Sequence, residues 1–250
     1  MNKVAIIQAR MGSTRLPGKA MLPILGKPVL GWMVERVKSC TFVDKVVVAT
    51  TPKSPPIINY CCDHGIDFFV GDEDDVIKRV CMTAAQFRAD VIVDLTSDCP
   101  LVDPFMIDNL LLLRRRNKYY SRSYYSNIEP RSWPDGFDCQ VYPAFLLYET
   151  ENQMTKFDPS REHSGWNILQ RRKKDLDDLV SKPAYQEKYN LPKMRLTLDY
   201  PEDFEVIKHI IEHFNSMDGY WHYHVKATEI IDYVLANPQI LVNKHLEAIS

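Results

Sequence analysis

The sequence predicts an α/β fold with a mostly parallel sheet, and three observations lead to that expectation. The first strand, Val4–Ile7, is an unbroken apolar run, which is typical of a parallel strand covered by helices on both faces. Strand and helix patterns then alternate along the chain, and such βαβ units favour a parallel sheet with right-handed crossovers. Finally, 250 residues with 45% hydrophobic content can bury one full core, and no linker interrupts them. We therefore expect a single domain.

The first half of the chain supplies most of the expected sheet. Pro28 favours a helix start, and apolar residues recur on one helical face as far as Cys40. The acidic residues Asp72–Asp75 suit the positive end of a helix dipole, so another helix begins there. The remaining elements of this half are strands at Lys45–Ala49, Asp67–Val70 and Val91–Leu95 and a short helix at Ile57–His64.

The later part of the chain has a different character. We expect a core of about residues 1–117 and 193–250, with a mixed α+β elaboration of about 118–192 between its two parts. Within the elaboration, Phe137–Tyr142 alternates like a half-exposed strand, and Asp158–His163 opens a helix with capping residues. The chain then returns to the core through a last strand and two helices, at Arg195–Leu198, from Pro201 and at Ala227–Leu235.

Composition and charge exclude several classes of protein. The formal net charge of −2 argues against a nucleic-acid-binding protein, because such proteins carry a basic excess over a whole face. The longest apolar stretches fall far short of the ~20 residues of a membrane span, and the N-terminus runs into a strand without a signal-peptide core. We therefore expect a cytoplasmic protein without membrane contact. The six cysteines show no CxxC pair and are expected to be reduced thiols without chemistry.

A loop rich in small and basic residues follows the first strand. Gly12, Ser13 and Thr14 let the backbone approach a ligand closely, and long cationic side chains suited to a polyanion come from Arg10, Arg15 and Lys19. The spacing does not fit the Walker loop, since Lys19 is followed by alanine, and it does not fit the dinucleotide fingerprint. By composition alone, the loop is either a phosphate-binding cradle or a solvated basic turn.

The carboxyl ends of parallel strands gather at one edge of a sheet, where the ligands of open α/β folds bind. This edge should bring the basic loop together with Thr50, Thr51 and Ser97–Pro100. Asp98 follows the fourth strand and is either a metal ligand or the cap of a turn, and Asp199 is either a metal ligand or a helix cap. Because Mg²⁺ prefers hard oxygen ligands and keeps several waters, two carboxylates and substrate phosphates would suit it.

Three stretches of the chain carry a family resemblance. Gln8–Lys19, Thr96–Pro104 and Arg195–Asp203 closely resemble, in the right order, motifs of the cytidylyltransferases that activate acidic sugars, such as acylneuraminate and 3-deoxy-manno-octulosonate, as CMP derivatives. The chain is most similar to the branch typified by spore-coat polysaccharide biosynthesis proteins, over nearly its whole length. The resemblance implies a Rossmann-like nucleotide-diphospho-sugar transferase fold whose elaboration binds the acceptor and forms a homodimer. The aromatic residues between Tyr119 and Tyr142 would supply the dimer contact.

The resemblance also implies an activity and its residues. The activity is Mg²⁺-dependent transfer of CMP from CTP to an acidic sugar, with release of pyrophosphate, for surface polysaccharide or glycoconjugate biosynthesis. The implied catalytic residues are Lys19, Arg15, Asp98 and Asp199, of which the two aspartates would bind Mg²⁺. The nucleotide would be bound by Gln8, Ala9, Arg10, Gly12, Ser13, Arg15, Lys19, Thr50, Arg79 and Ser97. The acceptor would be bound by Asp135, Asp138, Gln140, Arg161, Glu162 and His163.

Two departures from the branch leave parts of this assignment open. Ser54-Pro55-Pro56 stands where the branch tends to have acidic residues, so the contacts to cytosine are not determined. Gln140 stands in place of a glutamate, which removes a charge near the expected acceptor pocket. Independently of these departures, Arg79 could be either a nucleotide-binding residue or an exposed helix residue. The alternatives are a phosphonate or sugar phosphate acceptor, UTP or GTP in place of CTP, or a non-catalytic nucleotide-sugar-binding protein.

Overall fold

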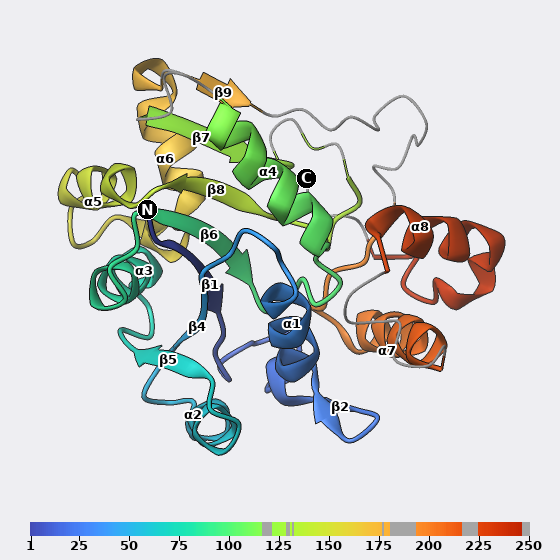
Figure 1. Cartoon of the computed structure of the whole chain (residues 1–250). Coiled ribbons are helices and arrows are strands. Elements are labelled where there is room, and N and C mark those ends of the chain that lie inside the picture. Colours follow the sequence, from blue (N-terminus) through green and yellow to red (C-terminus); the bar gives the residue numbers. More distant parts are fainter. Residues whose placement is uncertain are drawn as a thin grey trace.

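The computed structural model describes residues 1–116, 122–128, 131, 133–176, 178–180, 194–216 and 225–246, and Figure 1 shows the chain. The strands are β1 (Lys3–Gln8), β2 (Pro23–Ile24), β3 (Lys27–Pro28), β4 (Lys45–Thr50), β5 (Asp67–Val70), β6 (Val91–Thr96), β7 (Ser123–Ser126), β8 (Gln140–Pro143) and β9 (Asp178–Val180). The α-helices are α1 (Val29–Lys38), α2 (Pro55–Asp63), α3 (Val76–Gln86), α4 (Pro104–Arg116), α5 (Ala144–Asn152), α6 (Gly165–Arg172), α7 (Pro201–Asn215) and α8 (Ala227–Ala236). Short 3-10 helices include η1 (Lys19–Met21), η3 (Pro159–Glu162), η4 (Lys173–Asp175) and η5 (Pro238–Ile240).

Among the described residues, a seven-stranded sheet with the order β5-β4-β1-β6-β8-β7-β9 forms the centre of the fold (Figure 1). β1 is parallel to β4 on one side and to β6 on the other, and β5 continues the parallel part beyond β4. β8 pairs antiparallel with both β6 and β7. The predicted α/β fold with a mostly parallel sheet is confirmed, and the strands of the expected elaboration extend the same sheet.

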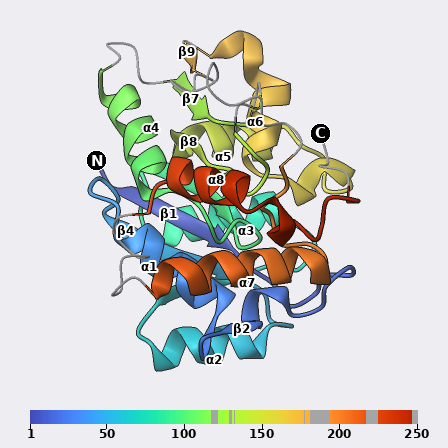
Figure 2. The same ribbon diagram turned by 90° about the vertical axis from the view of Figure 1, so that its right-hand side faces the viewer.

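Helices cover both faces of this sheet. In β1, Ala5 and Ile7 pack in one core with residues of α1 and α4, whereas Val4 and Ile6 pack in a second core with residues of α3, α5 and α6. Successive side chains of a strand point to opposite faces, which explains why β1 is apolar without alternation. A third core joins α7 and α8 to Trp32 of α1, and Figure 2 shows these two helices on the side turned toward the viewer.

The segment predicted as a last strand, Arg195–Leu198, does not join the sheet. In the described part of the chain it forms one isolated bridge, to Asp135. The N–H of Leu196 donates to the carbonyl oxygen of Asp135 (2.7 Å), and the N–H of Leu198 donates to that of Asp98 (2.8 Å). The prediction of a strand is wrong because this extended segment crosses two loops at the edge of the sheet and bonds to their carbonyl groups.

A glycine makes this crossing possible. Gly136 has a φ of 117°, which side chains rarely allow, and a Cβ atom at this position would overlap the carbonyl group of Leu196. Position 136 therefore requires a residue without a side chain, both for its own backbone and for the approach of the crossing segment.

Two predictions for the elaboration need correction. The strand expected at Phe137–Tyr142 begins at Gln140, and it is not half-exposed, because Val141 and Tyr142 are both fully buried against different cores. The helix expected from Asp158 is only the single turn η3, and α6 starts later, at Gly165. The predicted cap is confirmed, since the Asp158 carboxylate accepts a hydrogen bond from the N–H of Ser160 at 3.0 Å.

The predicted dimer contact is only partly visible. Tyr119 and Tyr120 lie outside the described residues, whereas Tyr124 and Tyr125 belong to β7 and are buried. In the regions that the structure describes, no helix combines the length and the apolar character needed to cross a bilayer.

Candidate active site

Loops from four strands meet at one edge of the sheet. The carboxyl ends of β1, β4 and β6 lie together because these strands are parallel neighbours. β8 is antiparallel to β6, with Gln140 opposite Asp94, so its first residue lies at the same edge. This topology brings together predicted residues from distant parts of the sequence, namely Gln8, Thr50, Ser97, Asp98, Asp138 and Gln140.

Lys19 lies at the centre of this edge. Its ammonium group donates to the carboxylates of Asp98 (3.2 Å) and Asp199 (2.9 Å) and to the carbonyl oxygen of Leu198 (2.8 Å). Burial by itself lowers the pKa of Lys19, but the two carboxylates raise that pKa above its ordinary value. Lys19 therefore remains charged and links the loop after β1, the loop after β6 and the segment before α7.

Asp199 receives cationic donors on both carboxylate oxygens. Its Oδ1 contacts Lys19 and the guanidinium of Arg15 (2.8 Å), and its Oδ2 accepts from Arg195 (2.8 Å). Burial raises the pKa of Asp199, but Lys19, Arg195 and Arg15 together bring that pKa below its ordinary value. Asp199 is therefore an ionised carboxylate surrounded by three cations.

Arg195 and Asp203, which sequence reasoning did not single out as site residues, hold Asp199 in place. The guanidinium of Arg195, with a side chain only 2% exposed, donates to Asp203 (3.1 Å), Asp199 (2.8 Å) and Asp135 (3.4 Å). Asp203 also accepts from the N–H groups of Asp199 (2.9 Å) and Tyr200 (3.0 Å). Asp203 therefore forms a capping box with Tyr200, the N-cap residue of α7, and Asp199 is not the cap. Arg195 and Asp203 stand four positions before and four positions after Asp199 in the sequence. This placement of a positive and a negative charge on either side of an aspartate is the signal that could have found them.

The carboxylate of Asp98 is the more open of the pair, since its side chain is 29% exposed and that of Asp199 is 10% exposed. It bonds to Lys19 and not to the backbone of its own turn, which argues against a capping role. In the described regions, no group of three or more His, Cys, Asp or Glu side chains could hold a metal ion. Asp98 and Asp199 could still supply two hard oxygen ligands, with substrate phosphates and water completing the shell.

The side of the edge next to β8 carries paired carboxylates. The guanidinium of Arg131 donates to both oxygens of Asp138 (2.8 and 3.0 Å) and lies 3.7 Å from Asp135. Burial and the neighbouring Asp138 raise the pKa of Asp135 to about 6, although nearby arginines act in the opposite direction. Gln140 accepts a hydrogen bond from the hydroxyl of Tyr124 (2.6 Å).

The opposite side of the edge, next to β4, carries two arginines. Arg10 and Arg79 each donate to the backbone carbonyl of Glu73 at 3.3 Å. Arg79 is only 2% exposed, so it is not the exposed helix residue that the sequence left open. The hydroxyl of Ser54 accepts from the N–H of Met11 (3.0 Å). The serine that departs from the branch pattern thus positions the loop after β1.

Comparison with known proteins decides the family. Residues 4–226 match the family model of the cytidylyltransferases. The chain belongs to this family. It is 29% identical to the spore coat polysaccharide biosynthesis protein SpsF of Bacillus subtilis over 248 residues, which are 97% of this chain and 98% of that protein. A cytidylyltransferase of known structure from Leptospira borgpetersenii is 30% identical, with a TM-score of 0.85 and coverage of 100% of this chain and 99% of its own.

A third relative covers only part of the chain. The 3-deoxy-manno-octulosonate cytidylyltransferase of Geobacter metallireducens is 34% identical over 111 residues, which are 44% of each chain. The resemblance inferred from the three motifs is thereby confirmed at the level of the family and its nucleotidyltransferase fold.

Gln8 of this cytidylyltransferase is half-buried, and its amide is bonded to other side chains of the protein. Its amide donates to Asp94 (2.6 Å) and to the hydroxyl of Ser164 (2.8 Å). Asp94 is buried and also accepts from the hydroxyl of Tyr142 (2.5 Å), and burial raises the pKa of Asp94 despite these hydrogen bonds. The side chain of Gln8 therefore joins β1 to the elaboration, and its predicted contact with the nucleotide gains no support from this geometry.

The other members of the predicted nucleotide set line the edge. The N–H groups of Ala9 and Ser97 are bonded to strand carbonyls, at 3.1 and 2.9 Å. The hydroxyl of Ser13 accepts from the N–H of Leu16 (3.3 Å), which shapes the loop between them. These contacts place the residues beside Arg10, Gly12, Arg15 and Lys19.

The three consecutive residues predicted to contact the acceptor, Arg161, Glu162 and His163, lie in different environments. Arg161 donates to Asp75 (2.9 Å) and Glu151 (2.5 Å), so it ties η3 to α3 and α5. Glu162 and His163 are exposed and lie 3.7 Å from each other. The structure thus gives Arg161 a role in packing and leaves the other two residues accessible.

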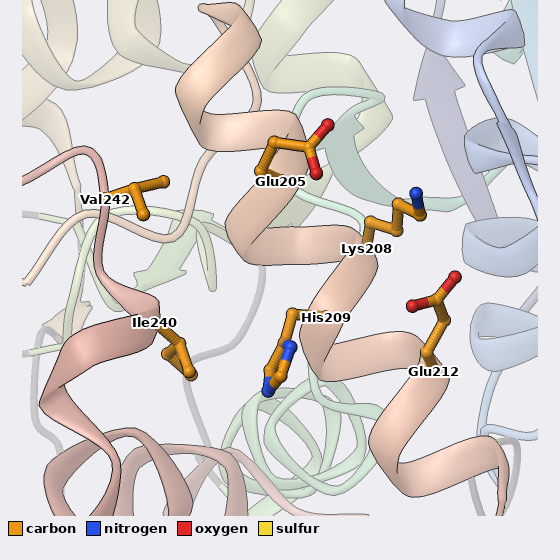
Figure 3. Close-up of a pocket in the computed structure, with 6 residues that line it drawn as sticks. All are labelled: Glu205, Lys208, His209, Glu212, Ile240 and Val242. Carbon is orange, nitrogen blue, oxygen red and sulfur yellow. The ribbon is translucent and has the colours of Figure 1, made fainter.

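A hollow on the outer face of α7 lies apart from these residues. It is shown in Figure 3 and is lined by Glu205, Lys208, His209, Glu212, Ile240 and Val242. None of the predicted site residues lines it, so we place the active site at the edge around Lys19.

Proposed function

We propose that this protein transfers CMP from CTP to a hydroxyl group of an acidic sugar, with release of pyrophosphate, for surface polysaccharide or glycoconjugate biosynthesis. The observation that carries the proposal is the contact of Lys19 with both Asp98 and Asp199, beside Arg15. Cations for phosphates, placed next to carboxylates for a metal ion, are what nucleotidyl transfer requires. The names of SpsF and of the 3-deoxy-manno-octulosonate cytidylyltransferase support the class of acceptor.

The reaction needs alignment and neutralisation of charge more than covalent help from the protein. The acceptor oxygen forms a bond to the α-phosphorus of CTP, the bond from that phosphorus to pyrophosphate breaks, and the hydroxyl proton passes to a base. Arg15 is 38% exposed and contacts the same carboxylate oxygen of Asp199 as Lys19 does, so both can neutralise the leaving pyrophosphate. Asp135, whose pKa is raised to about 6, is ionised at neutral pH and can accept the proton.

We include Mg²⁺ in the proposal, because Asp98 and Asp199 present hard carboxylate oxygens around one cationic centre. These two residues would hold the ion, which when bound neutralises phosphate charge. Lys19 and Arg195 lower the pKa of Asp199 and so keep it ionised. Arg195 also fixes the orientation of this carboxylate through its bond to Oδ2.

Two arginines that would suit a phosphorylated or phosphonate acceptor are already paired with carboxylates. Arg122 pairs with Glu149 through two contacts of 3.2 Å, and Arg131 pairs with Asp138. An acceptor phosphate would meet guanidiniums that are already neutralised. The hydroxyl groups of a sugar, in contrast, can donate to carboxylates such as Asp138.

The test is pyrophosphate release with Mg²⁺ and each of CTP, UTP, GTP and ATP, against a panel of acidic sugars, sugar phosphates and phosphonates. We expect release with CTP and an acidic sugar. Lys19→Ala should abolish release, whereas Lys45→Ala, which removes an exposed lysine at the amino end of β4, opposite the end that carries Thr50, should not. If no triphosphate supports release, and CMP-sugars nevertheless stabilise the protein against heat, the non-catalytic binding alternative is correct.

A further inference from the structure

Buried polar atoms without partners gather on the β4 side of the edge. Among the described residues, Thr50 Oγ1, Glu73 Oε2 and Arg79 Nε are buried and have no hydrogen-bond partner. The residues Thr50 and Arg79 are 0% and 2% exposed. Because buried polar groups are nearly always bonded, such a gathering requires an explanation. A ligand that supplies the missing partners would account for these atoms.

Thr50, Glu73 and Arg79 lie next to one another and form one wall of the edge, on its β4 side. The N–H of Gly71 donates to the carbonyl oxygen of Thr50 (2.9 Å), and a Cβ atom on Gly71 would lie 2.8 Å from Cγ of Arg79. Arg79 in turn donates to the carbonyl oxygen of Glu73 (3.3 Å). A Cβ atom on Gly12 would lie 3.0 Å from Oε1 of Glu73. The carboxylate of Glu73 therefore lies directly against the basic loop that follows β1.

Charged side chains lie close together in the described part of this wall, but they do not provide a hydrogen-bond partner for every buried atom. The guanidinium of Arg10 is 4.0 Å from Oε1 of Glu73, and burial together with Arg10 lowers the pKa of Arg79. Two other acids of the same loop are occupied, since Asp72 accepts backbone N–H groups and Asp75 caps α3. In the described chain, Oε2 of Glu73 is thus a buried carboxylate oxygen that still lacks a donor.

We propose that Glu73 selects cytosine by accepting a hydrogen bond from its exocyclic 4-amino group, an inference that rests on the proposed function. Cytosine presents this one donor beside two acceptors, N3 and O2, whereas uracil presents an oxygen at position 4. A carboxylate accepts from the amino group and repels the uracil oxygen. Arg10 and Arg79 can donate only, so they suit the ring acceptors. Arg15 and Lys19, in contrast, would contact phosphates that CTP and UTP share.

The experiment compares the binding of CTP and UTP to the full chain by isothermal titration calorimetry in the presence of Mg²⁺. Glu73→Gln keeps the size of the side chain but places an amide donor where uracil has an acceptor. We expect the ratio of CTP to UTP affinity to fall about tenfold or more, with UTP binding more tightly than before, because a hydrogen bond to a charged group contributes on that order. Asp74→Asn is the matched control, since it removes one charge from an exposed residue of the same loop and should leave the ratio unchanged.

A second measurement uses the unmodified protein, in case Glu73→Gln does not fold. A CTP analogue that lacks only the 4-amino group should bind about tenfold or more weakly than CTP. The inference is overturned if folded Glu73→Gln keeps the CTP to UTP ratio, or if the analogue binds as tightly as CTP. The proposed function fails separately, if the unmodified protein binds no triphosphate or prefers one other than CTP.

Discussion

Removal of the buried guanidinium of Arg195 should destabilise the protein strongly. Arg195→Gln leaves Asp135, Asp199 and Asp203 without their common cation, which is now within 3.4 Å of all three. Removing one partner of a buried ion pair costs about 3–5 kcal/mol. In a chain of 250 residues, each kcal/mol lowers Tm by about 2–4 °C, so Tm should fall by roughly 6–20 °C.

Thermal unfolding followed by circular dichroism at several pH values measures this effect. The cations around Asp199 lower its pKa in the folded protein, so their contribution to stability is present above the ordinary aspartate pKa of about 4 and is lost as the pH falls through the lowered value. Arg195 also lowers the pKa of Asp135, which burial and Asp138 still hold at about 6. The difference in stability between the unmodified protein and Arg195→Gln should therefore begin to shrink as the pH falls through about 6, and it should shrink further in acid below a pH of about 4.

An exposed ion pair provides the control. Lys45 and Asp67 form a pair whose side chains are 40% and 47% exposed, so Lys45→Gln should cost no more than about 1 kcal/mol. Arg195→Lys should lie between the two variants, because lysine keeps the charge but not the planar fork that reaches three carboxylates. The reasoning is refuted if Arg195→Gln lowers Tm no more than Lys45→Gln does.

Three other variants or measurements address the metal, the backbone and the assembly. Asp98→Asn should fold and lose turnover about a hundredfold or more, because metal stabilisation is worth several kcal/mol; Asp199→Asn should behave alike, and near-normal pyrophosphate release at low Mg²⁺ would contradict the metal site. Gly136→Ala should lower Tm more than Gly65→Ala, since both glycines have positive φ but only at Gly136 would a Cβ atom meet another segment. We expect a homodimer by light scattering, and a monomeric mass at micromolar concentration would contradict it.

Local sequence by itself determined the parallel half of the fold. β1, β4, β5 and β6 lie within one residue of their predicted spans at each end, because an apolar run bounded by turn and helix-start residues is a signal carried by neighbouring positions. Motif resemblance then assigned catalytic roles to Lys19, Asp98 and Asp199, which the structure brings into contact. The placement of all these residues at one edge followed from strand direction alone.

Only the tertiary structure decided which charges pair and which stay unpaired. Arg195 became the centre of a carboxylate cluster because its segment crosses a loop sixty residues earlier, at Asp135. Arg161, which was expected to contact the acceptor, instead binds Asp75, 86 positions earlier in the sequence. Glu73 became a candidate for recognising cytosine because its carboxylate is buried against Gly12. Burial and ion pairing depend on segments that meet only in the folded chain, so no local pattern contains them.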